Sequence, residues 1–378
     1  MFKESVPVGR ADAARVRALL ESPEATALCE EIAALRWTGR KGYSPRALVG
    51  ACIVKNLYCL PTWTKTTHLI ADHPALSEVL GEQPSRFACY RFLAKLRGHA
   101  ELLERMMERL VHEIKRLDPA LGTDIAIDGT DLPAYANGQS RLYHDGPLRA
   151  RFSDPDASWG HRSAVSTRKG GGFYGYKLHI AVCTRSELPV ALHVETGRRN
   201  EQPFALPLLD AVRRHGLEAT TAAMDAQYDS QKLFQAFEER DCHPVVVLKN
   251  DQAVKNGDHE PPRCQHGVWT FAGADYRHKR TKWRCPTGGC SPGSRWIKAS
   301  RLHPLIPYKS ERWKILYRRR SAVEREVGRL KHDFGLLPLR VRGIHRVRVH
   351  VTLAVIARLA SALDSMRATR LSHPAGSW

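Results

Sequence analysis

The pattern of hydrophobic and polar positions changes near residue 118 and divides the chain into a helical part and a mixed part. Before this point apolar residues recur at helical spacing, and capping signals mark three helix starts, at Ser44-Pro45, Pro61-Thr62 and Ser85. In the segment that follows Ser85 we expect a buried stripe of Phe87, Tyr90, Leu93, Ala94 and Leu96. A further helix is predicted from about His99 to Leu117. Residues 1–118 are therefore predicted to form an all-helical N-terminal domain.

Short helices joined by tight turns, one of them basic, are typical of a helix-turn-helix-like DNA reader. A bundle that mediates dimerisation has the same pattern. We favour a DNA-binding domain, and the dimerisation bundle stays open as the alternative.

After Asp118-Pro119 the period changes to the alternation of strands. The first predicted strand lies in TDIAIDGTDLPAYA, residues 123–136, and ends at Asp128. Residues 138–172 have little apolar periodicity and predict a mobile excursion. Beyond them we expect a hairpin, a helix over residues 200–215, a strand that ends at Asp225, a helix capped by Ser230 and an apolar strand in HPVVVLKND. This order favours a mixed sheet flanked by helices over residues 119–250.

Residues 251–310 interrupt this pattern with a segment rich in Cys, His and Trp. We predict a small β-rich insertion in which WTFAGADYRHKRTKWRC forms a basic hairpin, and in which Trp269, Trp283 and Trp296 form the core. Stacking of these indoles on extruded bases is the alternative. Structural Zn²⁺ is possible but not favoured, because the spacing fits no strong finger pattern; its candidate ligands are Cys264, Cys285 and Cys290 with His266, His278 or His303.

The stretch YRRRSAVEREVGRLK, residues 317–331, places an acid among arginines in a predicted helix. At about 100° per residue, Tyr317, Arg320, Glu324 and Lys331 project within roughly 60° of one another, and Glu326 projects about 180° from Tyr317. A solvated basic helix with i,i+4 ion pairs is the plain interpretation. Because Glu326 projects away from Tyr317, we expect it to be an exposed carboxylate. The final segment, residues 311–370, is expected to complete the core with helices.

Composition narrows the class of partner. The 378 residues carry a formal net charge of +20, with a pI of about 9.8, which favours a polyanion such as nucleic acid. The first residues have no apolar signal region, and VTLAVIARLASAL, which contains Arg358, is expected to be too short to span a bilayer. We therefore expect a cytoplasmic protein with no membrane partner. Nine cysteines, an odd number, indicate reduced thiols or a metal site and not a disulfide framework.

Three acids lie on elements that can converge, namely Asp128, Asp225 and Glu324. Separated carboxylates that meet in the fold are what a two-metal phosphodiester site needs. The alternatives are ordinary structural roles, since Asp128 precedes Gly129 as a turn acid would, and Asp225 or Asp229 resembles a helix cap. Asp229-Ser230 fits the cap better and leaves Asp225 free.

These residues resemble the DDE transposases of bacterial insertion sequences, in the branch with the signature Y-x2-R-x3-E-x6-K. Tyr317, Arg320, Glu324 and Lys331 match the signature at every position. The family's other blocks resemble IDGT at residues 127–130, SDPDASWGHRS with GGFYGYKLH, and MDAQYDS at residues 224–230. The resemblance extends from about residue 43 to residue 360. One departure is Gln227, where the family often has glycine.

The resemblance implies an α+β protein: an RNase H-like mixed-sheet catalytic core, a β-rich insertion and an N-terminal all-helical domain. It implies that Asp128, Asp225 and Glu324 bind Mg²⁺ or Mn²⁺ and are catalytic, and that Tyr317, Arg320 and Lys331 contact DNA phosphates. The enzyme would cleave double-stranded DNA at the terminal inverted repeats of the transposon and join the 3′ ends to target DNA, as a homodimer in the DNA complex, in the bacterial cytoplasm. A catalytically silent DNA-binding relative and a two-metal nuclease without strand transfer are the alternatives.

Overall fold

The computed structural model describes residues 10–35, 42–138, 152–162 and 170–372. The N-terminal part is helical, as predicted, and consists of α1 (Arg10–Leu20), α2 (Pro23–Ala34), α3 (Pro45–Leu57), α4 (Trp63–Asp72), α5 (Pro74–Leu80), α6 (Arg86–Leu96) and α7 (Ala100–Leu117). The predicted caps are confirmed, because the side chains of Ser44, Thr62 and Ser85 each accept a hydrogen bond from a backbone N–H in the first turn of the following helix.

The predicted buried stripe of α6 is confirmed for Leu96 but is wrong for Phe87, Tyr90 and Ala94, which are exposed. Phe87 is 58% exposed and Tyr90 is 52% exposed. Together with Leu96, the helix instead buries Ala88, Cys89 and Phe92, which were not in the predicted stripe. Both faces of α6 carry apolar residues, so spacing alone did not decide which face meets the neighbouring helices. The choice leaves an aromatic and basic face in contact with solvent.

The central sheet is mixed, as predicted. Its strands are β1 (Asp124–Pro133), β2 (Ser158–Arg162), β3 (Gly171–Cys183), β4 (Pro189–Thr196), β5 (Thr221–Met224) and β6 (His243–Val246). Their order is β2-β3-β1-β5-β6, and β4 also pairs with β3. Pairs between β3 and its neighbours are antiparallel, whereas β1, β5 and β6 are parallel. Helices α8 (Ala205–Arg214) and α9 (Gln231–Glu238) follow β4 and β5 in the chain.

Two strand predictions need correction. Asp128 does not end the first strand, because β1 continues to Pro133 in antiparallel register with β3. The predicted excursion over residues 138–172 contains β2, which pairs with the start of β3, so this part is ordered sheet structure. Residues 139–151 and 163–169 of the same stretch lie outside the described residues. Strand β2 was not predicted because it has only five residues, and most of them are polar or glycine.

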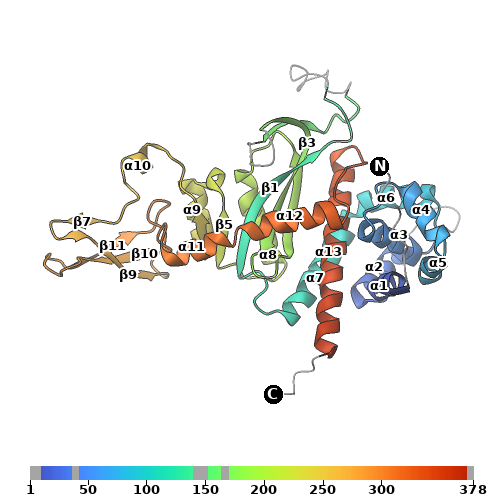
Figure 1. Ribbon diagram of the computed structural model, residues 1–378, viewed down its shortest axis with the longest axis horizontal. Helices are drawn as coiled ribbons and strands as arrows, with labels where there is room; N and C mark the ends of the chain where they lie inside the picture. Colours follow the sequence, from blue (N-terminus) through green and yellow to red (C-terminus); the bar gives the residue numbers. More distant parts are fainter. Residues whose placement is uncertain (1–9, 36–41, 139–151, 163–169, 373–378) are drawn as a thin grey trace.

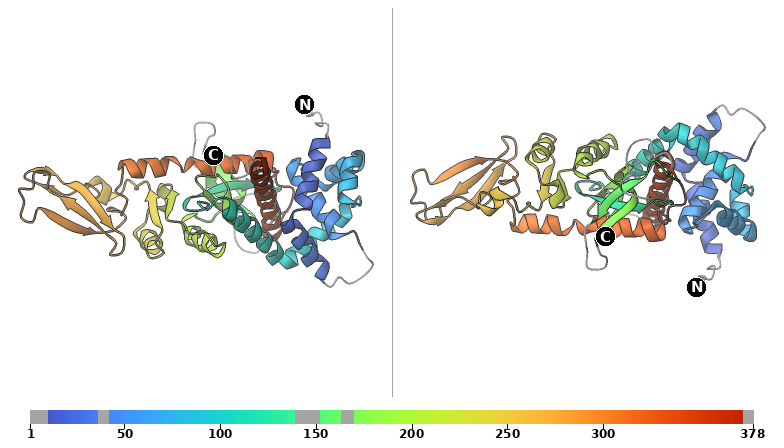
Figure 2. Two further views of the ribbon diagram at one scale, coloured as in Figure 1. Left: turned by 90° about the horizontal axis from the view of Figure 1, so that it is seen from below. Right: turned by 90° about the horizontal axis from the view of Figure 1, so that it is seen from above.

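The insertion is β-rich, as predicted, and lies at the opposite end of the molecule from α1–α6 (Figures 1 and 2). It contains α10 (Gln252–Lys255), β7 (Arg263–Cys264), β8 (Gly267–Val268), β9 (Thr270–Asp275), β10 (Arg280–Arg284) and β11 (Ser294–Lys298). The hairpin of β9 and β10 is confirmed, and Trp269 and Trp283 are buried. The prediction is wrong for Trp296, which is 44% exposed and packs against the side chains of Arg280 and Lys282.

Three helices complete the chain: α11 (Glu311–Arg318), α12 (Ser321–Asp333) and α13 (Ile344–Ser372). The predicted single helix over residues 317–331 is therefore two helices, but the interruption is slight. Arg320 N donates to Tyr317 O at 2.9 Å and Val323 N donates to Arg320 O at 3.1 Å, which are the i→i−3 bonds of a tightened turn. The two helices run nearly in line across the sheet from the insertion to α13 (Figures 1 and 2).

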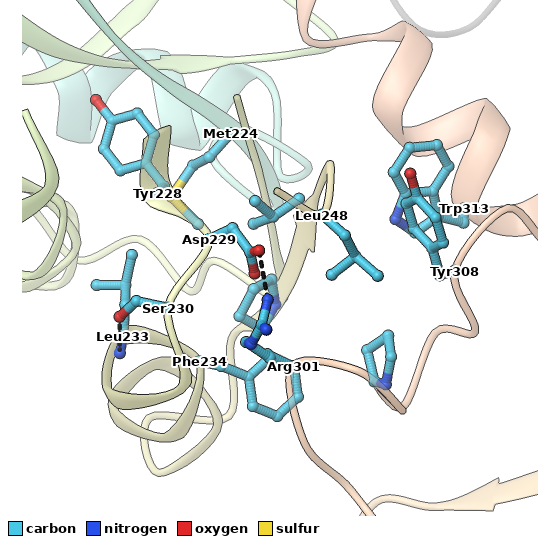
Figure 3. A pocket seen from close by; sticks show the side chains of 13 residues that line it. Met224, Tyr228, Asp229, Ser230, Leu233, Phe234, Leu248, Arg301, Tyr308 and Trp313 are labelled. Atoms are coloured by element: carbon cyan, nitrogen blue, oxygen red, sulfur yellow. Dashed lines mark hydrogen bonds and ion pairs between the residues drawn. The ribbon is translucent and has the colours of Figure 1, made fainter. Parts of the chain in front are cut away.

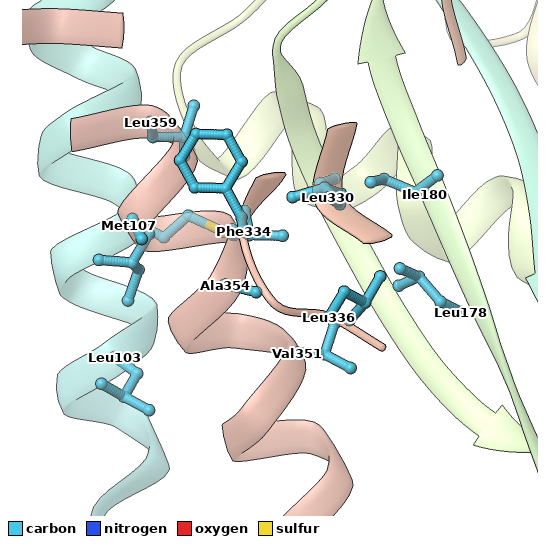
Figure 4. Packing of buried hydrophobic residues seen from close by; sticks show 14 of the residues in the cluster. Leu103, Met107, Leu178, Ile180, Leu330, Phe334, Leu336, Val351, Ala354 and Leu359 are labelled. Atoms are coloured by element: carbon cyan, nitrogen blue, oxygen red, sulfur yellow. The ribbon is translucent and has the colours of Figure 1, made fainter. Parts of the chain in front are cut away.

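The main hydrophobic core joins the N-terminal helices to the sheet. Figure 4 shows Leu103 and Met107 of α7 beside Ala354 and Leu359 of α13, with Leu330 of α12 facing the sheet. These side chains belong to one continuous cluster of buried residues. The helical part and the sheet are therefore packed together through α7 and α13.

Helix α13 is longer than the sequence predicted. Its segment Ile344–Arg370 is long and apolar enough, by length and composition, to cross a membrane, so the expectation that this stretch is too short was wrong. However, 56% of its most apolar window is buried inside the protein, where it packs against α7 and β4. This burial is typical of the core helix of a folded protein.

Glu326 is buried, which contradicts the expectation of an exposed carboxylate. It does point away from Glu324, but that direction faces α13 and not solvent. The Glu326 side chain is 0% exposed, and Arg358 Nε donates to its two carboxylate oxygens at 3.0 and 3.1 Å. Arg329 Nη1 donates to Glu326 Oε2 at 3.2 Å. Burial raises the pKa of Glu326, and the two guanidinium groups oppose that rise.

We expect Glu326→Ala to lower the free energy of unfolding by about 3–5 kcal/mol, because Arg358 would keep a buried charge without its partner. Urea denaturation measures the change. Glu311→Ala is the matched control, since that glutamate lies on α11 with an 83% exposed side chain; its loss should stay within about 0.5 kcal/mol. Equal effects of the two substitutions would contradict the structural role assigned to Glu326.

Candidate active site

The register of the parallel strands brings two of the predicted acids to one edge of the sheet. Ala126 pairs with Ala223; Asp128 lies two residues further along β1, and Asp225 lies two residues beyond Ala223, directly after the end of β5. The sequence suggested that Asp225 is free of a capping role, and this is wrong. Its Oδ1 accepts a hydrogen bond from Gln227 N at 2.8 Å. It caps the short 3₁₀ helix Ala226–Tyr228. Ser230 caps α9, as predicted.

Arg320 joins the third predicted acid to the first. Its Nη1 donates to Asp128 Oδ2 at 2.9 Å, and its Nη2 donates to Glu324 Oε1 at 2.5 Å. The Arg320 side chain is 20% exposed and that of Asp128 is 21% exposed, so this pair is largely withdrawn from water. Glu324 is 58% exposed and lies at the solvent side of the group. One guanidinium therefore holds two carboxylates that are almost 200 residues apart in the chain.

Glu201 is a fourth carboxylate at this site, and no local pattern in the sequence selects it. A Cβ on Gly129 would lie 2.6 Å from Glu201 Cδ, so the glycine of IDGT makes room for this side chain. Gly129 therefore lies inside β1 and does not form the turn considered above. Lys177 Nζ of β3 donates to Glu201 Oε1 at 3.1 Å, and both side chains are nearly buried. Only long-range packing brings Glu201 here.

The acids perturb one another. Burial raises the pKa of Asp128 to about 7, and the neighbouring carboxylates Glu201 and Asp225 add to the rise. The Arg320 guanidinium and the N–H of Gly129 oppose it. Tyr228 lies in the same field, and burial together with Glu201, Asp128 and Asp225 raises the pKa of its hydroxyl. The site therefore favours an added positive charge.

Tyr317 and Lys331 flank the acids on α11 and α12. The ring of Tyr317 stacks on that of Trp313, with 4.7 Å between centroids and 10° between planes. Burial raises the pKa of the Tyr317 hydroxyl, and nearby Arg320 opposes the rise. Lys331 Nζ donates to Thr130 Oγ1 at 2.6 Å, so it lies over β1, two residues beyond Asp128. The structure thus arranges the signature residues along one side of the sheet edge.

A second ion pair supports the site from the side of the insertion. Arg301 Nη1 donates to Asp229 Oδ2 at 2.6 Å, and the Asp229 side chain is only 2% exposed. Figure 3 shows this pair in a small pocket together with Tyr308 and Trp313. Asp229 also accepts a hydrogen bond from Lys249 N at 2.8 Å. Asp229 therefore ties the segment before α11 to the loop that follows Asp225, and it is a structural acid.

The residues present fit a divalent metal. Carboxylate oxygens are the ligands that Mg²⁺ and Mn²⁺ prefer. Burial, with a smaller contribution from the charges of Glu201 and Asp225, raises the pKa of Asp128, and Arg320 lies between Asp128 and Glu324, where a cation would bind. Asp128, Asp225 and Glu324 are the acids we assign as candidate ligands, and Glu201 lies beside them.

The pKa of Asp128 predicts a pH-dependent effect of Asp128→Asn. The carboxyl ionises near 3.8 in an unfolded chain and at about 7 in the folded protein, so the folded state binds more protons between these values and loses stability as pH rises. Asp128→Asn removes this loss. Relative to the unsubstituted protein, the variant should therefore gain stability between about pH 5 and 7, by up to about 1.4 kcal/mol per pH unit. Urea denaturation in metal-free buffers measures the difference, and a pH-independent difference would contradict the raised pKa.

Comparison with known proteins gives the family of the chain. The model of the family described as transposase DDE domain matches residues 119–360. Among solved structures, the chain is similar to the piggyBac transposase in a cryo-EM structure of its synaptic complex with hairpin DNA, at 9% identity and a TM-score of 0.41, over 96% of this chain and 82% of that chain. No curated protein matches the chain. Since the family model covers more than half of the residues, this chain belongs to the DDE transposase family.

Proposed function

We propose that this transposase uses Mg²⁺, or Mn²⁺, to cleave DNA at the ends of its element and to join the 3′ ends to target DNA. The observation that carries the proposal is the contact of one guanidinium, that of Arg320, with both Asp128 and Glu324, at the sheet edge where Asp225 follows the neighbouring strand. Three acids on separate elements, with a cation between two of them, are suited to phosphodiester chemistry. A silent relative would lack one of these groups.

Asp128, Asp225 and Glu324 would hold the metal, and Glu201 would add negative charge beside them. The bound metal would neutralise charge on the phosphate and would lower the pKa of a bound water molecule. The half-buried setting of Asp128 and Arg320 strengthens electrostatic interactions at the site, because less water screens them. The raised pKa of Asp128 implies that protons compete with cations below about pH 7.

The cations and the hydroxyl of the signature would orient the phosphates. Arg320 presents a planar fork of donors that suits phosphate oxygens, and Lys331 adds a point charge two residues beyond Asp128 along β1. Stacking on Trp313 limits the motion of the Tyr317 ring. These three side chains lie next to the acids, so we assign them to the DNA backbone near the scissile bond.

A basic and aromatic surface next to the N-terminal helices is suited to double-stranded DNA. The exposed face of α6 carries Arg86, Phe87, Tyr90, Arg91 and Lys95. Beside it lies a hollow of about 520 Å³ that α6 shares with the segment before α13; its basic residues include Lys55, Arg97, Arg340, Arg342 and Arg346. Phosphate contacts from such a surface would set the register of the terminal inverted repeat. We therefore favour DNA binding over dimerisation as the role of α6.

Each chain contributes one set of the three acids, whereas an element has two ends. We therefore propose a homodimer in the DNA complex, with one active site for each end. Target DNA would be the second nucleic-acid partner. From the chemistry of these partners we propose that the protein is located in the bacterial cytoplasm and is associated with the nucleoid when it is bound to DNA.

DNA affinity should fall steeply with salt, because phosphate contacts release counterions. A protein with 6–10 such contacts loses about 10³–10⁵ in affinity between 50 and 200 mM salt. In fluorescence-anisotropy titrations of duplex DNA, Arg91→Ala should reduce the slope of log K against log salt by about 0.9. Arg116→Ala on α7, whose side chain is 64% exposed and paired with Glu113, is the matched control and should leave the slope unchanged. A flat salt response of the unsubstituted protein would refute nucleic acid as the partner.

Glu324→Ala should abolish cleavage and strand transfer while DNA binding is retained. We expect a rate below about 1% of normal with Mg²⁺, because even loss of groups that only orient metal ligands costs 10–100-fold. The assay uses a labelled transposon end with a supercoiled target, and it scores cleaved and joined products separately beside gel-shift binding. Glu311→Ala is the control and should cut normally. A near-normal rate for Glu324→Ala would refute the assignment, and cleavage without joining in the unsubstituted protein would favour a nuclease.

A further inference from the structure

Three cysteines of the insertion meet in space, although they are dispersed in the sequence. Cys264 ends β7, Cys285 follows β10, and Cys290 lies in the turn before β11. Their sulfur atoms all lie within 4.8 Å of one another, and Cys264 Sγ is 3.8 Å from Cys285 Sγ. Two thiolates bound at about 2.3 Å to one tetrahedral Zn²⁺ would be about 3.8 Å apart. A disulfide, in contrast, needs about 2.05 Å.

The thiols lie in a half-buried site at the core of the insertion. Cys285 is 6% exposed and packs in a small cluster with Trp269 and Trp283, against which Cys264 and Cys290 are partly buried. This cluster has only three buried residues. So small a core supplies little stability, and small units of this kind commonly depend on a metal or a disulfide. All nine cysteines are among the described residues, and none forms a disulfide.

The ligand atoms that lie within 4.8 Å of one another are those of the three cysteines, and we take His266, whose Nε2 lies 3.2 Å from Gln265 Nε2, as the candidate for the fourth ligand. It follows Cys264 by two residues, and its ring lies against the glycine that precedes Cys290. A Cβ on Gly289 would lie 2.9 Å from His266 Nε2, so the glycine leaves the room that this imidazole occupies. His278 instead bonds to Asp275 at 2.8 Å, in the turn between β9 and β10.

His303, the remaining histidine considered from the sequence, interacts with a different part of the insertion. Burial lowers the pKa of His303, and its other interactions are with Asp258, His259 and Arg295. The residues against which His266 packs, in contrast, adjoin two of the three cysteines. His266 is therefore the histidine that we select.

We propose that Cys264, Cys285, Cys290 and His266 bind one structural Zn²⁺ ion. The sequence favoured an insertion without zinc because no close pair had a strong finger spacing. The structure changes that preference, because β7 and the end of β10 are brought side by side and each supplies a thiol. The ion would join the hairpin of β7 and β8 to the sheet of β9, β10 and β11. Binding converts the three thiols to thiolates with release of their protons, and no oxidant is involved.

Elemental analysis of the full chain tests the proposal directly. The protein is purified without a histidine tag, in chelator-free buffer under reducing conditions. About one zinc per chain is expected, and three additional thiols should become reactive to a thiol reagent once a chelator removes the metal. Absence of zinc after incubation with Zn²⁺ and dialysis would overturn the proposal. So would mass-spectrometric detection of a disulfide between Cys264 and Cys285.

Variants assign the ligands. Cys285→Ser with Cys290→Ser should remove the zinc, whereas Cys29→Ser, which changes a cysteine of α2 far from the insertion, should retain it. His266→Ala should weaken zinc retention during titration with a competing chelator at least tenfold, whereas His278→Ala, whose imidazole bonds to Asp275 in the turn between β9 and β10, should not. Retention of normal zinc content by the double cysteine variant would refute the site. Replacement of zinc by Co²⁺ in the unsubstituted protein should give the intense visible absorption of a tetrahedral thiolate site; a weak octahedral spectrum would contradict the proposed ligand set.

Discussion

Repulsion between carboxylates is the constraint on which the centre of this molecule depends. The sheet edge and the helix above it bring Asp128, Asp225, Glu201 and Glu324 into one neighbourhood, and burial makes their charges costly. Two cations from other elements offset this cost, since Arg320 contacts Asp128 and Glu324 while Lys177 contacts Glu201. The balance is incomplete, as the raised pKa of Asp128 indicates. A site of this kind is prepared to bind further positive charge.

Local signals in the sequence were sufficient for most elements and for selecting Asp128, Asp225 and Glu324 as candidates. Hydroxyl side chains before apolar runs located helix starts, because capping depends on a few adjacent residues. The spacing of Arg320 and Glu324 placed both on one face, and the structure joins them through a hydrogen bond. The position of Asp225 could also be predicted, because it follows a short apolar strand and the carboxyl ends of parallel strands lie at a common edge of the sheet.

Features decided by distant segments were not predictable from local patterns. Helical spacing gave the direction of Glu326, but its burial depends on Arg358, which lies 32 residues further along the chain. Helical spacing predicted that Tyr90 of α6 is buried, but the neighbouring helices cover Phe92 and leave Tyr90 exposed. Glu201 joins the site only because Gly129 has no side chain, and that contact links two segments with no common motif. The cysteines of the insertion likewise meet through contacts between distant segments, because strand pairing brings them together.

The position of α12 has a mechanical consequence for the acids. Asp128 lies in β1 and Asp225 directly follows the paired strand β5, so both are held by the sheet, whereas Glu324 belongs to a helix that continues from the insertion through α11. The distance between the first two acids is therefore set by the sheet, and the distance to the third is set by how the helix seats. A slide of α12 by one residue, about 1.5 Å, would move Arg320 and Glu324 together and would stretch the 2.9 Å bond from Arg320 to Asp128 beyond hydrogen-bonding range. The completeness of the acid triad is thus a property of an interface, and a force applied to the insertion acts on it along the axis of α11 and α12.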